Sequence, residues 1–188
     1  MALEHALLVA LSEQPAAGLE LARRFEKSIG FFWHATHQQI YRVLARMEAD
    51  GWVTVEEVAQ TGRPAKKVYA VSASGAAVLR DWLATPVPME AFRSELAVKM
   101  RGASYGDRAA LLEVVRAARA DHEARLQHYR QLEARDYPQP GQLTGAELDQ
   151  HLVLRGGIRL EEFWIAWLDD YLAAHDAAAH PVKKEQSA

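Results

Sequence analysis

The side chains best suited to binding chemistry lie on one segment, residues 36–53, THQQIYRVLARMEADGWV. Its apolar residues recur with the spacing of one buried helical face: Ile40, Val43, Leu44 and Met47. The opposite face has no carboxylate before Glu48 and carries amide and guanidinium groups from Gln38, Gln39, Arg42 and Arg46. Such groups can read base edges or bind phosphate. The helix could therefore contact a nucleic acid, or this face could be an ordinary solvated surface.

Clear signals mark where this helix starts and stops. Thr36 and Gln39 form a capping box, so the helix should begin at Thr36, and Gly51 is a natural C-terminal stop. Two shorter helices are predicted before it, each from one apolar stripe. The first carries Leu3, Leu7, Leu8 and Leu11 and stops near Pro15; the second carries Leu21, Ala22, Phe25 and Ile29, between Gly18 and Gly30.

Two predicted strands follow the third helix, at residues 52–58 and 68–71. The loop between them, AQTGRPAKK, contains the turn formers Gly62 and Pro64 and several cations without an acid. Three helices and a hairpin with a basic tip match the winged helix-turn-helix plan, in which the third helix enters the major groove of DNA. An ordinary exposed hairpin is the alternative. The residues predicted to contact DNA are Thr36, His37, Gln38, Gln39, Tyr41, Arg42, Arg46, Arg63, Lys66 and Lys67.

The second half of the chain is predicted to be helical. Ser72 caps a fourth helix, and a linker with Pro86 and Pro88 leads to a short helix near residues 92–100 and a long helix over 107–135. The last helix should follow a capping box of Thr144 and Glu147. The sequence thus predicts a mainly α protein with a small β-hairpin: a winged helix-turn-helix domain over 1–85, a helical dimerisation and effector domain over 86–176, and a disordered tail over 177–188.

The last helix is apolar around much of its circumference between residues 148 and 172, so it needs more than one neighbour. A second copy of the chain is the simplest source of a further neighbour for this helix, so the sequence predicts a homodimer. The predicted interface comprises Leu152, Leu154, Ile158, Phe163, Ile165, Leu168 and Leu172. Trp164 and Trp167 could pack in that interface or line a pocket for a small hydrophobic or aromatic effector. Gly156-Gly157 could allow close helix approach or break the helix, and both interpretations stay open.

Composition excludes several classes of protein. The chain has 188 residues, a formal net charge of −3 and no cysteine, which suits a reducing cytoplasm. The sequence contains no apolar run of about 20 residues, so no membrane span is predicted. The sequence contains no P-loop, dinucleotide fingerprint, GxSxG or HExxH, so we expect neither an enzyme nor a cofactor. His34 and His37 could start a metal site, but no third ligand lies near them, and no metal is expected.

About the first 85 residues resemble the PadR family of bacterial transcriptional regulators. The resemblance rests on features in a fixed order: Gly18 and Glu20, Phe32-Trp33, Gln39-Ile40-Tyr41, Leu44, Glu48, Gly51, Gly62-Arg63-Pro64, Val68-Tyr69, Gly75 and Trp82-Leu83. Residues 92–100 and the long helices are similar to the longer-tailed PadR subfamily, which includes virulence-gene activators. The chain departs from the family at Leu19, His37 and Trp52. His37 alters the base-facing edge of the third helix, so an operator sequence cannot be carried over from relatives.

The resemblance implies a homodimer, formed largely by the C-terminal helices, that binds a palindromic operator near a promoter. It also implies that Tyr41 touches a phosphate through its hydroxyl. Many members of the family are repressors released by a small molecule, and the same behaviour is expected here. The alternative from another functional class is a winged-helix module that binds a protein and no DNA.

Overall fold

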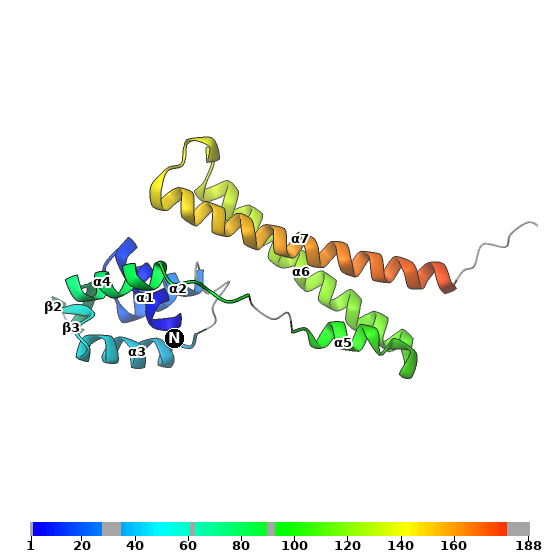
Figure 1. Ribbon diagram of the computed structural model, residues 1–188, viewed down its shortest axis with the longest axis horizontal. Coiled ribbons are helices and arrows are strands. Elements are labelled where there is room, and N and C mark those ends of the chain that lie inside the picture. Colours follow the sequence, from blue (N-terminus) through cyan, green and yellow to red (C-terminus); the bar gives the residue numbers. More distant parts are fainter. Residues whose placement is uncertain (1, 28–34, 61–62, 90–92, 180–188) are drawn as a thin grey trace, which may run out of the picture. The chain divides into compact units, whose positions relative to one another are not determined.

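The computed structural model describes residues 2–27, 35–60, 63–89 and 93–179 (Figure 1). The chain forms two compact units, residues 1–89 and 90–188. The sequence-based boundary after Thr85 remains a prediction. No helix in the described part of the chain is both long and apolar enough to cross a membrane.

Within its described residues, the first unit contains four helices and a three-stranded antiparallel sheet with strand order β1-β3-β2. Its elements are α1 (Ala2–Glu13), β1 (Ala16–Ala17), α2 (Gly18–Lys27), α3 (His37–Ala49), β2 (Val53–Gln60), β3 (Arg63–Val71) and α4 (Ala73–Leu83). The predicted end of the second helix, at Ile29 and Gly30, lies outside the described residues. Strand β1 was not predicted, because two alanines carry no alternating pattern; Ala16 pairs with Tyr69 and Ala17 with Val68.

The hairpin is longer than the sequence pattern predicts. Strand β3 begins at Arg63 rather than Val68, and the ladder extends to the pair Gln60–Arg63. Apolar spacing reveals a strand only where one face is buried. Arg63, Lys66 and Lys67 pair with residues of β2 through their backbone although their side chains are polar, so the sequence pattern indicated a loop.

The core of the first unit forms where α1, α2 and α3 meet. Ile40, Val43, Leu44 and Met47 are buried there, which confirms the predicted inner face of α3. They pack with residues of the two preceding helices: Leu7, Leu8, Leu11, Leu21, Ala22 and Phe25. This packing fixes the rotation of α3 about its own axis, and so decides which of its side chains point outward.

Two glycines shape the exits from α3 and from the sheet. Gly51 has φ 70°, the left-handed conformation that ends α3 as predicted. Gly75 lies in the first turn of α4, where a Cβ would stand 2.0 Å from the carbonyl oxygen of Trp52. Only glycine allows this close approach of α4 to the residue that precedes β2. Ser72 caps α4 as predicted, its hydroxyl accepting from the Gly75 N–H at 3.0 Å.

The second unit is built on two long helices. Its elements are α5 (Glu95–Arg101), η2 (Ala103–Tyr105), α6 (Arg108–Asp136), η3 (Pro140–Gln142) and α7 (Gly145–Ala179). Helix α7 runs through Gly156-Gly157 without a break, so the glycines do not interrupt it. It continues to Ala179, three residues into the segment predicted to be a disordered tail; residues 180–188 lie outside the described part of the chain.

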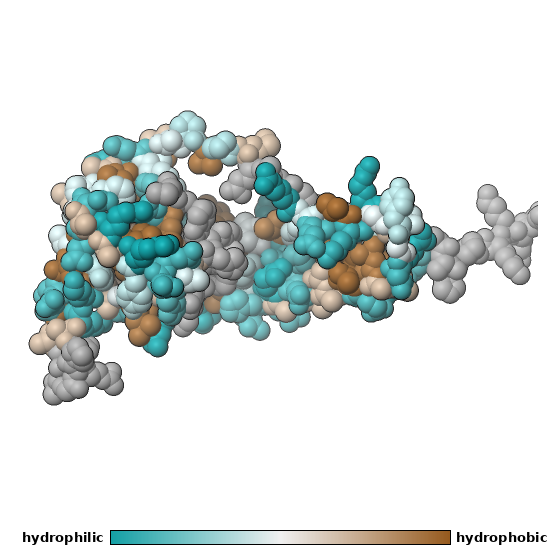
Figure 2. Space-filling view, turned by 90° about the horizontal axis from the view of Figure 1, so that it is seen from below, coloured by the Kyte–Doolittle hydropathy of each residue, from teal (hydrophilic) through white to brown (hydrophobic). Residues whose placement is uncertain are grey.

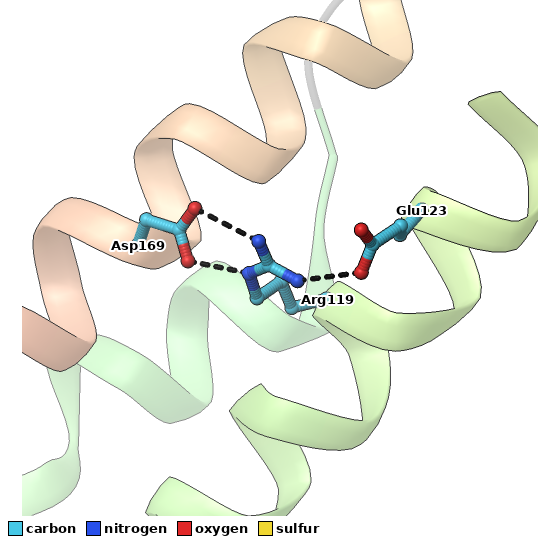
Figure 3. Close-up of polar contacts among 3 residues, drawn as sticks. All are labelled: Arg119, Glu123 and Asp169. Atoms are coloured by element: carbon cyan, nitrogen blue, oxygen red, sulfur yellow. Dashed lines mark hydrogen bonds and ion pairs between the residues drawn. The ribbon is translucent and has the colours of Figure 1, made fainter. Parts of the chain in front are cut away.

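A small core and a series of ion pairs join α6 to α7. Met100, Val115 and Leu168 form the buried centre of the core. Arg119 of α6 bonds to Asp169 of α7, Nη2 to Oδ2 at 3.2 Å, and to Glu123 on its own helix at 2.8 Å (Figure 3). These carboxylates raise the pKa of Arg119, Asp169 having the largest effect. Further pairs follow in opposite order along the two helices, Arg116 with Asp176 and Arg130 with Glu162, so the helices are antiparallel.

Candidate nucleic-acid interface

The outer face of α3 is accessible along its whole length. Six of the residues that the sequence predicted for DNA contact on this helix are exposed: His37, Gln38, Gln39, Tyr41, Arg42 and Arg46; Thr36, which caps it, is exposed too. The first turn of α3 contains no acidic residue. In the view of Figure 2, hydrophilic side chains predominate over the first unit, with separate apolar ones between them. The structure therefore brings the predicted residues of α3 onto one accessible surface.

The two glutamines of the first turn differ in what they do for the fold. The Oε1 of Gln39 accepts from the backbone N–H of Thr36 at 2.8 Å, and the Thr36 hydroxyl accepts from the Gln39 N–H at 3.2 Å. This is the predicted capping box. Gln38 is exposed and takes no part in it. Gln39 thus holds the start of α3 in place, while the side chain of Gln38 can serve a ligand.

The two arginines of α3 also differ. Arg46 donates to Glu4 of α1, whose side chain is buried. A buried carboxylate needs such a partner, so this pair fastens α3 to α1 and neutralises one cation of the face. Arg42 is exposed and, in the described part of the chain, has no ion-pair partner. Its guanidinium group is the cation of α3 that is available to a base or a phosphate.

The hairpin lysines lie on strand β3 and not on the predicted basic loop. Lys66 stands three residues beyond Arg63, about 10 Å along the strand at ~3.3 Å per residue. Lys66 Nζ lies 3.2 Å from Glu20 Oε2, and Lys67 Nζ lies 3.5 Å from Glu48 Oε1. The segment AQTGRPAKK itself contains no acid, but acids far away in sequence reach both lysines in the folded chain. Arg63 begins β3, and its side chain is not among the described ones.

Tyr41 lies beside the start of α2. A Cβ on Gly18 would be 2.4 Å from Cε1 of the Tyr41 ring, so the glycine makes room for that ring. Tyr41 nevertheless remains 45% exposed, which leaves it accessible to a ligand. Nearby, burial and then the charge of Glu48 raise the pKa of Tyr69, so this phenol stays neutral. Sequence reasoning missed Glu4, Glu20 and Glu48 as partners, because only the fold brings them to these cations.

The predicted dimer residues of α7 divide into two groups. Leu168 and Ile158 are buried within the chain's own fold, and Leu154, Ile165 and Leu172 are partly buried. Leu152 and Phe163 are exposed, and so are Val153 and Leu160, which the prediction did not include. These four exposed side chains form what we call the outer stripe of α7: Leu152, Val153, Leu160 and Phe163. Leu168 and Leu172 pack with residues of α5 and α6, whereas the side chains of the outer stripe are exposed.

The tryptophans of α7 belong to a cluster of rings. Trp164 stacks on His122 of α6 with ring centroids 5.0 Å apart, and Trp167 lies 5.2 Å from Trp164 and packs against the core. Neither lines the groove of about 810 Å³ found between α6 and α7. That groove is lined by Arg130, Glu133, Arg155, Ile158, Arg159, Glu162 and Phe163. Phe163 is the ring that both features share, since its centroid lies 6.1 Å from each tryptophan.

Two histidines of the long helices, His122 and His151, pair with buried or half-buried carboxylates. His122 Nδ1 lies 2.5 Å from Glu161 Oε2, and His151 Nε2 lies 3.0 Å from Glu133 Oε1. His34 lies outside the described residues. Among the residues that are described, no group of three or more His, Asp and Glu side chains is arranged to hold a metal ion.

Comparison with known proteins identifies the family of both halves. Residues 7–81 match the transcriptional regulator PadR-like family, and residues 92–176 match the virulence activator alpha C-term family. The probable transcriptional regulator Rv1176c of Mycobacterium tuberculosis is 52% identical over 184 residues, which cover 93% of this chain and 97% of that protein. The chain belongs to the PadR-like family of transcriptional regulators.

Further relatives confirm the fold of this PadR-like chain. The negative transcriptional regulator PadR of Bacillus subtilis is 27% identical over 93% of this chain and 97% of its own. The Vibrio cholerae virulence activator AphA has a TM-score of 0.77 at 28% identity, over 93% of this chain and 98% of AphA. Bacillus subtilis PadR has been solved with operator DNA, with a TM-score of 0.82 at 24% identity, over 93% of this chain and 99% of that one. The predicted fold class and non-enzymatic regulator class are confirmed.

The different uses of the two glutamines can be tested by their effect on stability. Replacing Gln39 with alanine removes one half of the capping box and should lower the free energy of unfolding of the first unit by roughly 0.5–1.5 kcal/mol. Gln38→Ala is the matched control and should change it by less than about 0.5 kcal/mol. Chemical denaturation followed by tryptophan fluorescence measures both. Equal effects of the two substitutions would contradict the assignment of the cap to Gln39.

Proposed function

We propose that this chain is a homodimeric repressor that binds operator DNA through α3 and the β2–β3 hairpin and is released by a small hydrophobic or aromatic effector. The observation that carries the proposal is the outer face of α3. It is exposed throughout, it has no acid in its first turn, and it presents amide and guanidinium groups beside the cations of the hairpin. These are the groups that read base edges and bind phosphates.

The two parts of this surface have different roles in the proposal. Gln38 stands in the first turn of α3, where side chains of a recognition helix point toward base edges, and Arg42 lies one turn further on. Lys66 and Lys67 stand on the hairpin, where their ammonium groups can reach the phosphate backbone. Arg63 and Tyr41 would join the backbone contacts, whereas Arg46 contributes less because Glu4 already holds it. Thus α3 selects the sequence and the hairpin anchors the complex.

Repression and release are proposed by analogy with a relative. Bacillus subtilis PadR is a negative transcriptional regulator, and its structures with operator DNA and with p-coumaric acid share the fold of this chain. An aromatic effector also suits the ring cluster of Phe163, Trp164 and Trp167 beside the groove of α6 and α7. AphA is a virulence activator, so activation is the alternative outcome of a promoter assay.

The outer stripe of α7 supports the homodimer. Its four apolar side chains are each more than half exposed in a single copy, a pattern typical of a surface that a partner covers. Gly156 lies in the middle of the stripe, and no described atom would lie within 4 Å of its Cβ. The fold of one copy therefore does not require glycine there, and close approach of a second helix would. Apolar side chains are also exposed around α5, where Figure 2 shows brown patches, and Val98 of this helix is 71% exposed.

A winged-helix module that binds a protein and no DNA is the alternative function. Such a module has no use for an acid-free first turn beside a free arginine and a basic hairpin. Failure to bind any duplex at low salt would favour this alternative.

The roles of helix and hairpin predict two different effects on DNA binding. Replacing Lys66 and Lys67 with alanine should weaken binding to every duplex alike and flatten the plot of log K against log salt by about 0.9 for each phosphate that is no longer neutralised. Gln38→Ala should leave that slope nearly unchanged and reduce the preference for operator over scrambled DNA by about 1–3 kcal/mol. Anisotropy titrations at several salt concentrations, with DNA from upstream of the chain's own gene and a scrambled copy, give both quantities.

The reverse outcome would show that the assignment is wrong. Gln38→Ala could change the slope of log K against log salt while the lysine substitutions change only the discrimination between duplexes. In that case the hairpin reads the DNA sequence and α3 binds the phosphate backbone.

The homodimer predicts a loss of association when a charge enters the outer stripe. Leu160→Asp should convert the dimer to a monomer at low micromolar concentration, because the carboxylate would be desolvated between two helices. Leu83→Asp is the matched control: Leu83 is 66% exposed on α4, against 52% for Leu160, and this variant should stay dimeric. Sedimentation equilibrium measures the mass of each. A wild-type monomer, or a Leu160→Asp variant that still dimerises, would contradict the proposed interface.

A further inference from the structure

Three cations of the proposed DNA surface, Arg46, Lys66 and Lys67, are held by carboxylates of the protein itself. Glu4 is buried, and its pairing with Arg46 serves the fold. The acids that hold the hairpin lysines are different, because their side chains stay 47% exposed at Glu20 and 39% exposed at Glu48. A carboxylate so exposed is already solvated and needs no cation to be stable. The fold alone therefore does not account for these two pairs.

Each of these two ion pairs joins residues from different elements of the fold. Glu20 lies on α2 and reaches Lys66 at 3.2 Å, and Glu48 lies near the end of α3 and reaches Lys67 at 3.5 Å. Successive residues of a strand project to opposite faces, so the two lysines leave β3 on opposite sides. The acids that reach them come from two different helices, α2 and α3. Both helices belong to the helix-turn-helix, which is the part of the unit that DNA would approach.

We propose that Glu20 and Glu48 compete with DNA phosphates for Lys66 and Lys67. This competition prevents the protein from binding DNA whose sequence α3 does not recognise. This inference rests on the proposed function. Exposed ion pairs are weak, so phosphates can displace these carboxylates when the rest of the surface fits. The competition lowers backbone affinity for all DNA, since phosphates are the same in every sequence. Only duplexes that also gain base contacts from α3 then bind tightly enough to be occupied.

Charge removal at the two acids tests the competition. Glu20→Gln and Glu48→Gln keep the side-chain shape and remove the charge. Each should tighten binding of a fluorescent scrambled-sequence duplex by roughly three- to tenfold at low salt, and steepen the salt slope by up to about 0.9 for each lysine released. Asp81→Asn is the matched control, with the same change in net charge. Asp81 is exposed on α4, which lies on the other side of α1 from α3 (Figure 1), and this variant should tighten binding by less than about twofold.

A double variant separates competition from simple repulsion. If Glu20 acts by holding Lys66, the gain from Glu20→Gln should disappear when Lys66 is already alanine. A gain that persists in full would show that the acid merely repels phosphate, and would overturn the competition. Weaker binding by the Gln variants would also overturn it, because the acids would then position the lysines for DNA. Should wild type and all variants fail to bind any duplex, the proposed function itself fails and the inference with it.

Discussion

Burial of one face of α3 is the constraint on which the first unit depends. Ile40, Leu44 and Met47 have no exposed surface in the structure, and each such side chain contributes roughly 1.5–3 kcal/mol when it leaves water. The apolar side chains can be buried against α1 and α2 in one rotation of the helix only. That rotation directs the amides and Arg42 outward, and the capping box fixes where the helix begins. The proposed interface with DNA is therefore a consequence of how the core packs.

In the second unit, α7 likewise has one side buried in the core and another side exposed. Its inner residues, with Leu168 at the centre, close a core against α5 and α6. Buried polar groups line the same inner side, where Glu161 meets His122 and Arg125, and satisfied pairs of this kind tend to define one register between helices. The four side chains of the outer stripe of α7 stay more than half exposed in a single copy of the chain. The same helix thus packs in the core of its own copy and presents the surface proposed to bind a second copy.

The sequence predicts best what apolar spacing and capping determine. The inner face of α3, its capping box, its stop at Gly51 and the cap of α4 are all present in the structure. Strand β1 and the outer half of the hairpin were missed, because two alanines and a polar strand give no alternation. The continuous path of α7 through Gly156-Gly157 could not be predicted, since tertiary packing can outweigh the helix propensity of glycine.

Side-chain partners were the least predictable part of the site. Local spacing could not show that Glu4, Glu20 and Glu48 reach Arg46, Lys66 and Lys67, because each pair joins different elements. The same limit applies to α7, where a helical projection gives two apolar stripes but not which of them α6 covers. In both places the pattern identified the surface, and only the folded chain showed which of its groups are already engaged.

The central claim is that two copies of α3 read one duplex together, and a footprint tests it most directly. Hydroxyl-radical footprinting should be done on DNA from upstream of the chain's own gene. Two-fold symmetry predicts two protected segments on one face of the duplex, with centres about 10–10.5 base pairs apart, the spacing of successive major grooves. A single protected segment would contradict paired recognition by a dimer. Uniform weak protection without any segment would contradict sequence-specific binding by α3.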